Sequence, residues 1–401
     1  MQRDRISVLF VIDNLLIGGA QELVKTLSLN LNKDIFSVAV CSLVDYAGKS
    51  AIEPLTREIE EGGVPVVTIR MEDWREPEGQ KILLDLTREK AVDVLHVHLS
   101  PADLWMTRMT ACRQVPVKLF TKHETYHNKS LPRRIANAYY FNKFYDCALA
   151  ISDLSAEHLI KYEFILPWKV RKIVNPVDMS KFSPSSFSGM QGRRDLGIPP
   201  SAFVVGSVTR FVPRKGVEFF IQTAARVLRQ VDDAWFVLVG YGETEDQLRK
   251  VVDELGLASR FVFAGPRRDI PRMLSCMDVF LFTPIWGESL PIVLLEAMAM
   301  GKAIVASNVC SNREIIAEGI SGFLPAPASW ASVVDNLDCD ALAQAVVRFA
   351  RSPSLREECG RNARRKAEQV YDIHVIVKQL EDLYRELLTP GKVKSGVLGS
   401  G

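Results

Sequence analysis

The sequence predicts an α/β protein built from two doubly wound, Rossmann-like domains. Two sets of short, β-branched apolar runs alternate with helix-length segments, which is the pattern of a parallel sheet covered by helices on both faces. A stretch rich in Pro, Ser and Gly separates the two sets. The length of 401 residues also exceeds what one core usually organises, so two domains are expected.

The first set of apolar runs defines an N-terminal domain, residues 1–178. Its predicted strands are 6–12, 36–43, 64–69, 92–98, 117–120, 147–151 and 170–174. The loop after the first run contains Gly18 and Gly19 and leads into a helical pattern. Backbone N–H groups of such a loop can approach an anion at the helix N-terminus, although an ordinary tight turn has the same sequence.

The second set of runs follows residues 179–200, whose composition predicts a linker. Strands are predicted at 203–208, 235–239, 261–263, 279–282 and 303–306. They define a C-terminal domain, residues 201–372. The amphipathic segment 373–390 is expected to be a helix that packs back toward the N-terminal domain, and 391–401 is a Gly- and Ser-rich tail.

Composition excludes several classes of protein. Lys and Arg number 50 against 48 Asp and Glu, so the net charge of +2 gives no reason to expect nucleic acid as a partner. The seven cysteines are scattered without a CxxC pair, which disfavours disulfides and zinc and indicates a reducing compartment. No apolar run approaches the roughly 20 residues of a membrane span. A cytoplasmic location is therefore expected.

Two acids and two cations stand where a ligand of parallel sheets would bind. Arg210 and Lys215 follow the first strand of the second domain, where they can bind a diphosphate; an exposed basic loop is the alternative. Pro291 suits the first position of a helix, so Glu288 belongs to the loop and Glu296 to the helix. At roughly 12 Å apart along a helical path, these acids can hold two ends of a long polar ligand.

Other motifs have plainer explanations. Asp338-Cys339-Asp340 resembles a metal-binding DxD motif, but it precedes an amphipathic segment and is better interpreted as a helix cap. His123 directly follows a predicted strand, which favours a functional role over a buried structural histidine. His96 and His98 lie within a strand pattern and are interpreted as structural.

In combination, these residues resemble the family 4 glycosyltransferases, retaining enzymes of the GT-B fold, in which two Rossmann-like domains face each other across a cleft. The resemblance rests on the E-x7-E spacing of Glu288 and Glu296, Arg210 with Lys215, the Gly18-Gly19 loop, His123 and residues 173–178. It extends from the first strand to the helix ending near Leu388. Two departures are that Leu290-Pro291 replaces a frequent Phe-Gly, and that Ser311-Asn312-Arg313 precedes Glu314 where many relatives have Gly-Gly.

The resemblance implies that a nucleotide-sugar binds the second domain and the acceptor binds the first, without a metal or other cofactor. Arg210 and Lys215 would neutralise the diphosphate, Glu296 would bind the ribose and Glu288 the sugar. The implied catalytic residues are His123, Glu288, Arg210 and Lys215, and the implied nucleotide-sugar site comprises Gly18, Gly19, Arg210, Lys215, Glu288, Ser289, Leu290 and Glu296.

The expected function is transfer of a hexose from a UDP- or GDP-sugar to a hydroxyl of a glycan or lipid-linked acceptor, in polysaccharide or glycoconjugate synthesis. The alternatives are a nucleotide-sugar epimerase of the same fold and a non-catalytic nucleotide-sugar-binding protein. Residues 129–145 mix basic and aromatic side chains, which suits a peripheral contact with the inner face of a membrane; a core helix with a solvated basic edge is the other interpretation.

Overall fold

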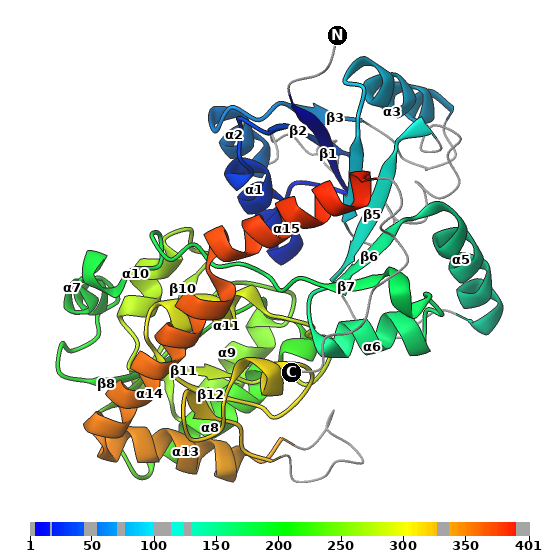
Figure 1. The fold of residues 1–401 in the computed structure, drawn as a ribbon. Helices are drawn as coiled ribbons and strands as arrows, with labels where there is room; N and C mark the ends of the chain where they lie inside the picture. The colour runs from blue at the N-terminus through cyan, green and yellow to red at the C-terminus, as the bar shows by residue number, and fades with distance from the viewer. Residues whose placement is uncertain are drawn as a thin grey trace. The chain divides into compact units, whose positions relative to one another are not determined.

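The computed structural model describes residues 5–16, 18–43, 54–69, 77–98, 114–123, 130–326 and 337–389. The chain forms two compact units: Met1–Asn175 with Ile373–Gly401, and Pro176–Asp372. Each unit is built around its own parallel β-sheet with helices packed on it (Figure 1). The predicted α/β architecture of two Rossmann-like domains is confirmed.

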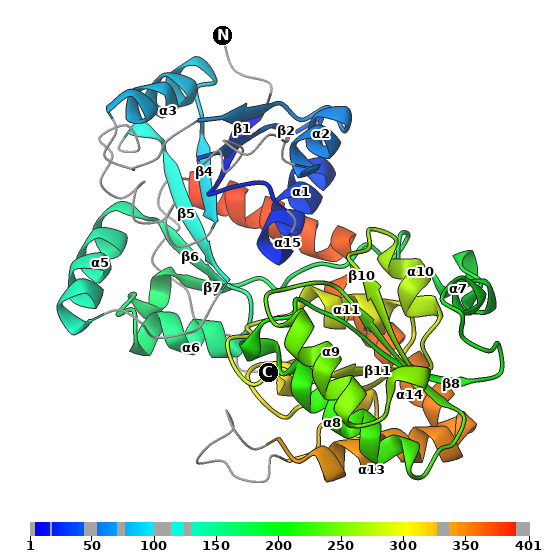
Figure 2. The same cartoon turned by 180° about the vertical axis from the view of Figure 1, so that it is seen from behind.

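The first unit contains a seven-stranded parallel sheet of order β3-β2-β1-β4-β5-β6-β7. Its strands are β1 (Ile6–Ile12), β2 (Phe36–Ser42), β3 (Val66–Thr68), β4 (Val94–His98), β5 (Val117–Lys122), β6 (Cys147–Ala150) and β7 (Val170–Lys172). Its helices include α1 (Gly19–Asn30), α2 (Pro54–Glu61), α3 (Pro77–Glu89), α5 (Leu131–Phe144) and α6 (Asp153–Lys161). Figures 1 and 2 show helices on both sides of the sheet, which explains why β4 is buried along its whole length.

The last helix of the chain, α15 (Ile373–Leu388), belongs to the first unit. Its apolar stripe, including Ile376, Leu380 and Tyr384, is buried. Glu381 of this helix accepts a hydrogen bond from the backbone N–H of Asn32, at 2.8 Å, just beyond α1. The first unit is therefore held together in part by contacts between the last helix and the N-terminal part of the chain.

The second unit contains a six-stranded parallel sheet of order β10-β9-β8-β11-β12-β13. Its strands are β8 (Phe203–Val208), β9 (Ala234–Val239), β10 (Phe261–Gly265), β11 (Val279–Phe282), β12 (Ala303–Ala306) and β13 (Gly322–Phe323). Its longer helices are α8 (Val217–Leu228), α9 (Glu245–Glu254), α11 (Ile292–Ala299), α13 (Cys339–Arg351) and α14 (Pro353–Lys366), and its shorter ones are α7 (Gly189–Asp195), α10 (Ile270–Ser275) and α12 (Asn312–Ile315). The sequence predicts every strand of this sheet except the two-residue β13.

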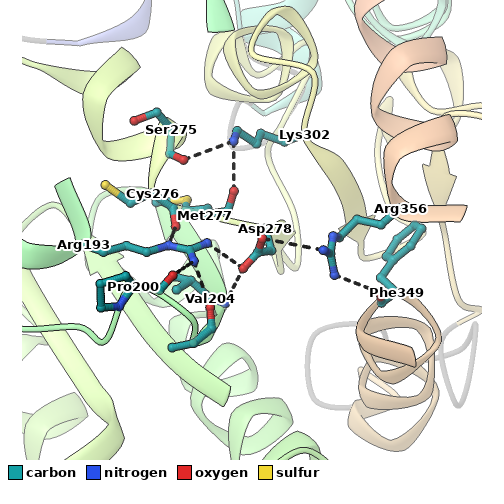
Figure 3. A network of polar contacts seen from close by, with 11 residues as sticks. Arg193, Pro200, Val204, Ser275, Cys276, Met277, Asp278, Lys302, Phe349 and Arg356 are labelled. Atoms are coloured by element: carbon teal, nitrogen blue, oxygen red, sulfur yellow. Dashed lines mark hydrogen bonds and ion pairs between the residues drawn. The ribbon is translucent and has the colours of Figure 1, made fainter. Parts of the chain in front are cut away.

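Residues 179–200 differ from the linker that their composition predicts, because they belong to the second unit. Within them α7 packs so closely that a Cβ atom on Gly189 would lie 2.4 Å from the carbonyl oxygen of Ser275. Arg193 of α7 pairs with Asp278 at 2.7 Å, and the Asp278 carboxylate also accepts from the backbone N–H of Val204 at 2.8 Å. Figure 3 shows this network, which ties α7 to the amino ends of β8 and β11.

The two ends of the second unit lie side by side. The backbone N–H of Val177 donates to the carbonyl oxygen of Tyr371 at 2.7 Å, and Val177 forms an isolated parallel bridge with Asp372. The chain therefore enters and leaves this unit at neighbouring points.

Two local expectations can be compared with the structure. Asp338 is the N-cap of α13, and its side chain accepts from the backbone N–H of Ala341 at 2.8 Å, which confirms the capping interpretation of the DxD-like motif. Pro291, expected at the first position of α11, is instead its N-cap residue in an extended conformation. The helix thus begins one residue later than predicted.

Candidate functional site

Three loops meet at the carboxyl edge of the second sheet. They follow β8, β11 and β12, and these strands are neighbours in the sheet. The loops therefore lie beside one another at the edge where ligands of doubly wound sheets bind. Arg210 and Lys215 lie in the first loop, Glu288 lies in the second, and Cys310 and Ser311 lie in the third.

The first two loops come into contact at Gly216, a position that requires glycine for two reasons. Its φ of +59° lies in the left-handed region, and a Cβ atom would stand 2.0 Å from the carbonyl oxygen of Thr283. The Thr283 hydroxyl donates to the Gly216 carbonyl oxygen at 2.9 Å. The backbone N–H of Ile285 donates to the carbonyl oxygen of Arg214 at 3.0 Å. This close approach brings Arg214 and Lys215 to the second loop.

Glu288 is the centre of a buried ionic cluster, with only 6% of its surface exposed. Its Oε1 atom accepts from Lys215 Nζ at 2.6 Å and from Arg214 Nη1 at 3.0 Å. The neighbouring Gly287 has φ of +80°, and a Cβ atom there would lie 3.4 Å from Arg214 Nη1. We call Arg214, Lys215 and Glu288 the cation–carboxylate cluster.

Burial lowers the pKa of Lys215, and the Glu288 carboxylate opposes that change. The charges of Arg214 and Arg210 lower the pKa of this lysine further. The Arg210 side chain is exposed, and within the described residues it makes no side-chain hydrogen bond or ion pair. Three cations thus stand near one carboxylate, and the excess positive charge suits a polyanionic ligand such as a diphosphate.

The structure places Arg210, Lys215, Glu288, Ser289 and Leu290 in loops at one sheet edge, and it adds Arg214. Ser289 and Leu290 are buried beside Glu288, and the Ser289 carbonyl oxygen accepts a hydrogen bond from the Ser311 hydroxyl. Glu296 lies on α11 and is partly buried. The sequence signal for Arg214 was its position next to Lys215 in the same basic loop, although nothing in the sequence distinguishes it from a solvent-facing arginine.

The third loop contains an unusual backbone conformation. Cys310 has φ of +53°, a left-handed value that non-glycine residues rarely adopt. Burial raises the pKa of its thiol, and the backbone N–H groups of Gly287 and Glu288 oppose that change. The loop that departs from the Gly-Gly pattern of many relatives therefore packs directly against the cation–carboxylate cluster.

The carboxyl edge of the first sheet holds the other predicted residues. Gly18 is the N-cap of α1, and Gly19 begins that helix after β1. His123 follows β5 directly, and β4 lies between β1 and β5 in the sheet. His98 ends β4, and its Nδ1 atom lies 3.1 Å from Nε2 of His123. Sequence reasoning missed this contact, since it interpreted His98 as structural alone.

The described residues contain neither a metal-binding group of side chains nor a membrane-spanning helix. No group of three or more His, Cys, Asp and Glu side chains there could hold a metal ion. Within the same residues, no helix combines the length and the apolar character needed to cross a membrane.

Comparisons with known proteins identify the family of this chain. The family model described as Glycosyltransferase Family 4 matches residues 17–181, and the model described as Glycosyl transferases group 1 matches residues 191–366. An Escherichia coli UDP-Gal:alpha-D-GlcNAc-diphosphoundecaprenol alpha-1,3-galactosyltransferase is 26% identical over 314 residues, covering 76% of this chain and 78% of that protein. A putative colanic acid biosynthesis glycosyltransferase, WcaL of Salmonella typhimurium, is 25% identical over 320 residues, covering 76% of this chain and 73% of that protein.

Solved structures show the same fold. HepE of Anabaena in complex with UDP has a TM-score of 0.81 at 21% identity, and the match covers 95% of this chain and 100% of that one. WaaG, a glycosyltransferase involved in lipopolysaccharide biosynthesis, has a TM-score of 0.66 at 15% identity, covering 96% of this chain and 100% of that one. With both halves matched by glycosyltransferase models and the whole chain superposing on these folds, the protein belongs to the family 4 glycosyltransferases of the GT-B fold.

Proposed function

We propose that this glycosyltransferase moves a hexose from a UDP-sugar to a hydroxyl group of a glycan or lipid-linked acceptor, with retention of anomeric configuration and without a metal ion. The cation–carboxylate cluster at the carboxyl edge of the second sheet is the observation that carries the proposal. The uridine donor is supported by the relatives, because HepE binds UDP and UDP-glucose and the Escherichia coli relative is named for UDP-Gal. That relative's diphosphoundecaprenol acceptor supports a lipid-linked acceptor and a role in glycoconjugate or polysaccharide synthesis.

The cluster addresses the main physical problem of glycosyl transfer. As the bond from the sugar to the phosphate breaks, negative charge grows on the departing diphosphate while the sugar becomes oxocarbenium-like. Lys215, Arg214 and Arg210 can stabilise that charge, and partial burial of Lys215 and Arg214 strengthens the interaction. Neutralisation of the leaving group by side chains would make a divalent cation unnecessary.

The two glutamates take different parts of the donor in this proposal. Glu288 accepts hydrogen bonds from hydroxyls of the hexose, and Glu296 on α11 accepts them from the ribose. The proposal also assigns Gly18, Gly19 and His123 of the first unit to the donor sugar. The acceptor hydroxyl then attacks on the face from which the diphosphate leaves, and the departing phosphate oxygen takes its proton.

Transfer assays on Arg210→Ala and Lys215→Ala test the diphosphate contact. A charge-assisted contact of about 1.5 to 3 kcal/mol predicts a loss of roughly tenfold to a hundredfold in kcat/KM for each variant. Arg361→Ala, which removes an exposed cation of α14, is the control and should retain full activity. Transfer at the parent rate by both site variants would show that the diphosphate binds elsewhere.

Three further assays test this function, its metal independence and its alternatives. Incubation with donor alone should leave the nucleotide-sugar unchanged apart from slow hydrolysis, whereas quantitative epimerisation would support an epimerase. Excess chelator should leave transfer largely intact, and complete loss that a divalent ion restores would contradict metal independence. Binding of the donor without turnover of any lipid-linked or glycan acceptor would support a binding protein.

We further propose that α5 contacts an anionic membrane that carries the acceptor. Its outer face exposes Leu131, Ile135 and Tyr139, at 53%, 56% and 57% of their surfaces, one helical turn apart. The exposed Lys143 donates to the Tyr139 hydroxyl at 2.9 Å. Tyr162, Phe164 and Trp168 are also exposed nearby in the chain. An apolar row flanked by cations is the chemistry that binds the interface of an anionic bilayer.

Vesicle co-sedimentation tests the membrane contact. The protein should pellet with phosphatidylglycerol-containing vesicles at low salt, and less with pure phosphatidylcholine vesicles. A variant carrying Ile135→Ser and Tyr139→Ser should lose this binding, while Ile82→Ser, which removes an exposed apolar side chain of α3, should keep it. Equal recovery of the parent protein with both lipids would refute the electrostatic contact.

A further inference from the structure

Three histidines form a continuous group inside the first unit. His96 and His98 lie on β4, and their ring centroids are 4.2 Å apart. His96 has partners on both ring nitrogens: the Tyr384 hydroxyl at 2.7 Å on Nδ1 and the Thr121 hydroxyl at 2.7 Å on Nε2. His98 has a partner on one ring nitrogen alone among the described residues. Its Nδ1 atom contacts His123, while its Nε2 atom is buried without a hydrogen-bond partner there.

Burial favours the neutral form of all three imidazoles. Burial lowers the pKa of His96 to about 3 and that of His123 to about 4, with the charge of Lys122 adding to the effect on His123. Burial and the two neighbouring histidines lower the pKa of His98 well below its usual value. A neutral imidazole carries one hydrogen on its two ring nitrogens, so one nitrogen donates and the other accepts.

The contact between His98 Nδ1 and His123 Nε2 therefore has two arrangements. If His123 donates, the hydrogen of His98 sits on its Nε2 atom, where the donor is buried without an acceptor. If His98 donates, its Nε2 atom is a bare acceptor. Orphaned buried N–H groups are rarer than orphaned acceptors, so the second arrangement is favoured.

We propose that His98 is a positioning residue that donates to His123 and thereby holds it as the tautomer with hydrogen on Nδ1. His123 then offers an N–H donor to its ligand at the carboxyl edge of the first sheet, and it has no free lone pair with which to act as a base. The role goes beyond the structural interpretation of His98. Its effect on transfer rests on the proposed function, which assigns His123 to the donor sugar.

The side chains behind His98 keep its ring in place. His96 packs against one side of the imidazole, and Phe10 lies 5.6 Å from its centroid. Tyr384 of α15 fixes His96 through its hydroxyl. The last helix of the chain thus supports the histidine that orients His123.

Nitrogen-15 NMR of the histidines in the intact protein tests the tautomer directly. The resonances of His123, assigned by their loss in His123→Gln, should show hydrogen on Nδ1 and none on Nε2. A parent spectrum with hydrogen on Nε2 of His123 would overturn the proposal. Because this measurement needs no turnover, it stands or falls independently of the proposed function.

Two variants of His98 connect the tautomer to activity. His98→Asn keeps a donor near the position of Nδ1, so the tautomer of His123 and most of kcat should be retained. His98→Leu removes the donor, so His123 should show both tautomers and kcat should fall about tenfold or more with a smaller change in KM for the donor. An unchanged His123 spectrum in folded His98→Leu would overturn the proposal.

A matched control separates positioning from general stability. His158 is another buried histidine of the first unit, on α6, and it lies 3.5 Å from Glu163 rather than beside His123. His158→Asn should leave the His123 tautomer unchanged, whatever its effect on the melting temperature. If transfer activity is absent in the parent protein but the tautomer is as expected, the proposed function fails and the role of His98 remains.

Discussion

Glu288 pairs with Lys215 and Arg214 through a single oxygen atom, so an anion already faces both cations before a donor binds. In the proposed function this side chain binds the hexose, while Glu296 binds the ribose. Glu288→Gln should therefore cripple transfer yet leave affinity for UDP unchanged or higher, because UDP has no hexose and a competing charge has been removed. Glu296→Gln should weaken both, and isothermal calorimetry with UDP distinguishes the two variants.

Glu357→Gln provides the control for these substitutions, because that glutamate is exposed on α14. It should change neither transfer nor UDP affinity. Loss of UDP affinity in Glu288→Gln as large as in Glu296→Gln, with both proteins folded, would contradict the separate roles. Glu288 would then act mainly by holding Arg214 and Lys215 in place.

The sequence could place Lys215 and Glu288 near each other, because both follow strands that parallel topology brings to one edge. It could not pair them. Their contact depends on left-handed backbone at Gly216 and Gly287, which brings the two loops within hydrogen-bonding distance. The same geometry turns Arg214 toward Glu288, and no sequence pattern distinguishes this arginine from an exposed one.

At the scale of elements, long apolar runs were sufficient to predict most strands. The predicted ranges 6–12, 203–208, 279–282 and 303–306 coincide with β1, β8, β11 and β12, because strands buried on both faces read as uninterrupted apolar runs. β13 has two residues and no such signal. Residues 179–200 have a loop-like composition, yet Arg193 anchors them through a tertiary contact that local sequence does not encode.

The network in Figure 3 also contains Lys302, which immediately precedes β12. Its Nζ atom donates to the carbonyl oxygens of Met277, at 2.9 Å, and Ser275, at 3.4 Å. Burial lowers the pKa of this lysine to about 8, against the opposing charge of Asp278. The folded protein therefore releases this proton at a lower pH than the unfolded chain does.

Between about pH 8 and pH 10.5 the unfolded chain retains a proton on Lys302 that the folded protein has lost, so this lysine makes stability rise with pH. Relative to Lys302→Met, the free energy of unfolding of the parent protein should rise by up to about 1.4 kcal/mol per pH unit in that window. Urea titrations of both proteins at pH 7 to 10 measure it. A difference that stays constant with pH would show that the lysine titrates normally.

At the scale of the whole molecule, the first unit contains both ends of the sequence, because α15 packs into its core. Leu380→Ala should therefore destabilise the first unit by about 2 to 5 kcal/mol, the usual cost of truncating a buried leucine. Hydrogen exchange should show lost protection in β1, β4 and β5 but not in β8 or β11.

Lys378→Ala on the same helix is the matched control, because this lysine is exposed and its ion pair among the described residues is with Asp382, one turn away. It should change stability by no more than about 0.5 kcal/mol. Equal loss of protection in both units for Leu380→Ala would show that they unfold as one cooperative block.

The pairing of Val177 with Tyr371 and Asp372 has a consequence for how such a chain can be recombined. Pro176–Asp372 is an insert in the sequence of the first unit, whose two flanking pieces end at Asn175 and begin again at Ile373. Since the two junctions are adjacent, the corresponding segment of a homologue could replace the insert without a change in the order of any strand. If donor preference resides in the insert and acceptor preference in the flanking pieces, such an exchange would change the donor alone.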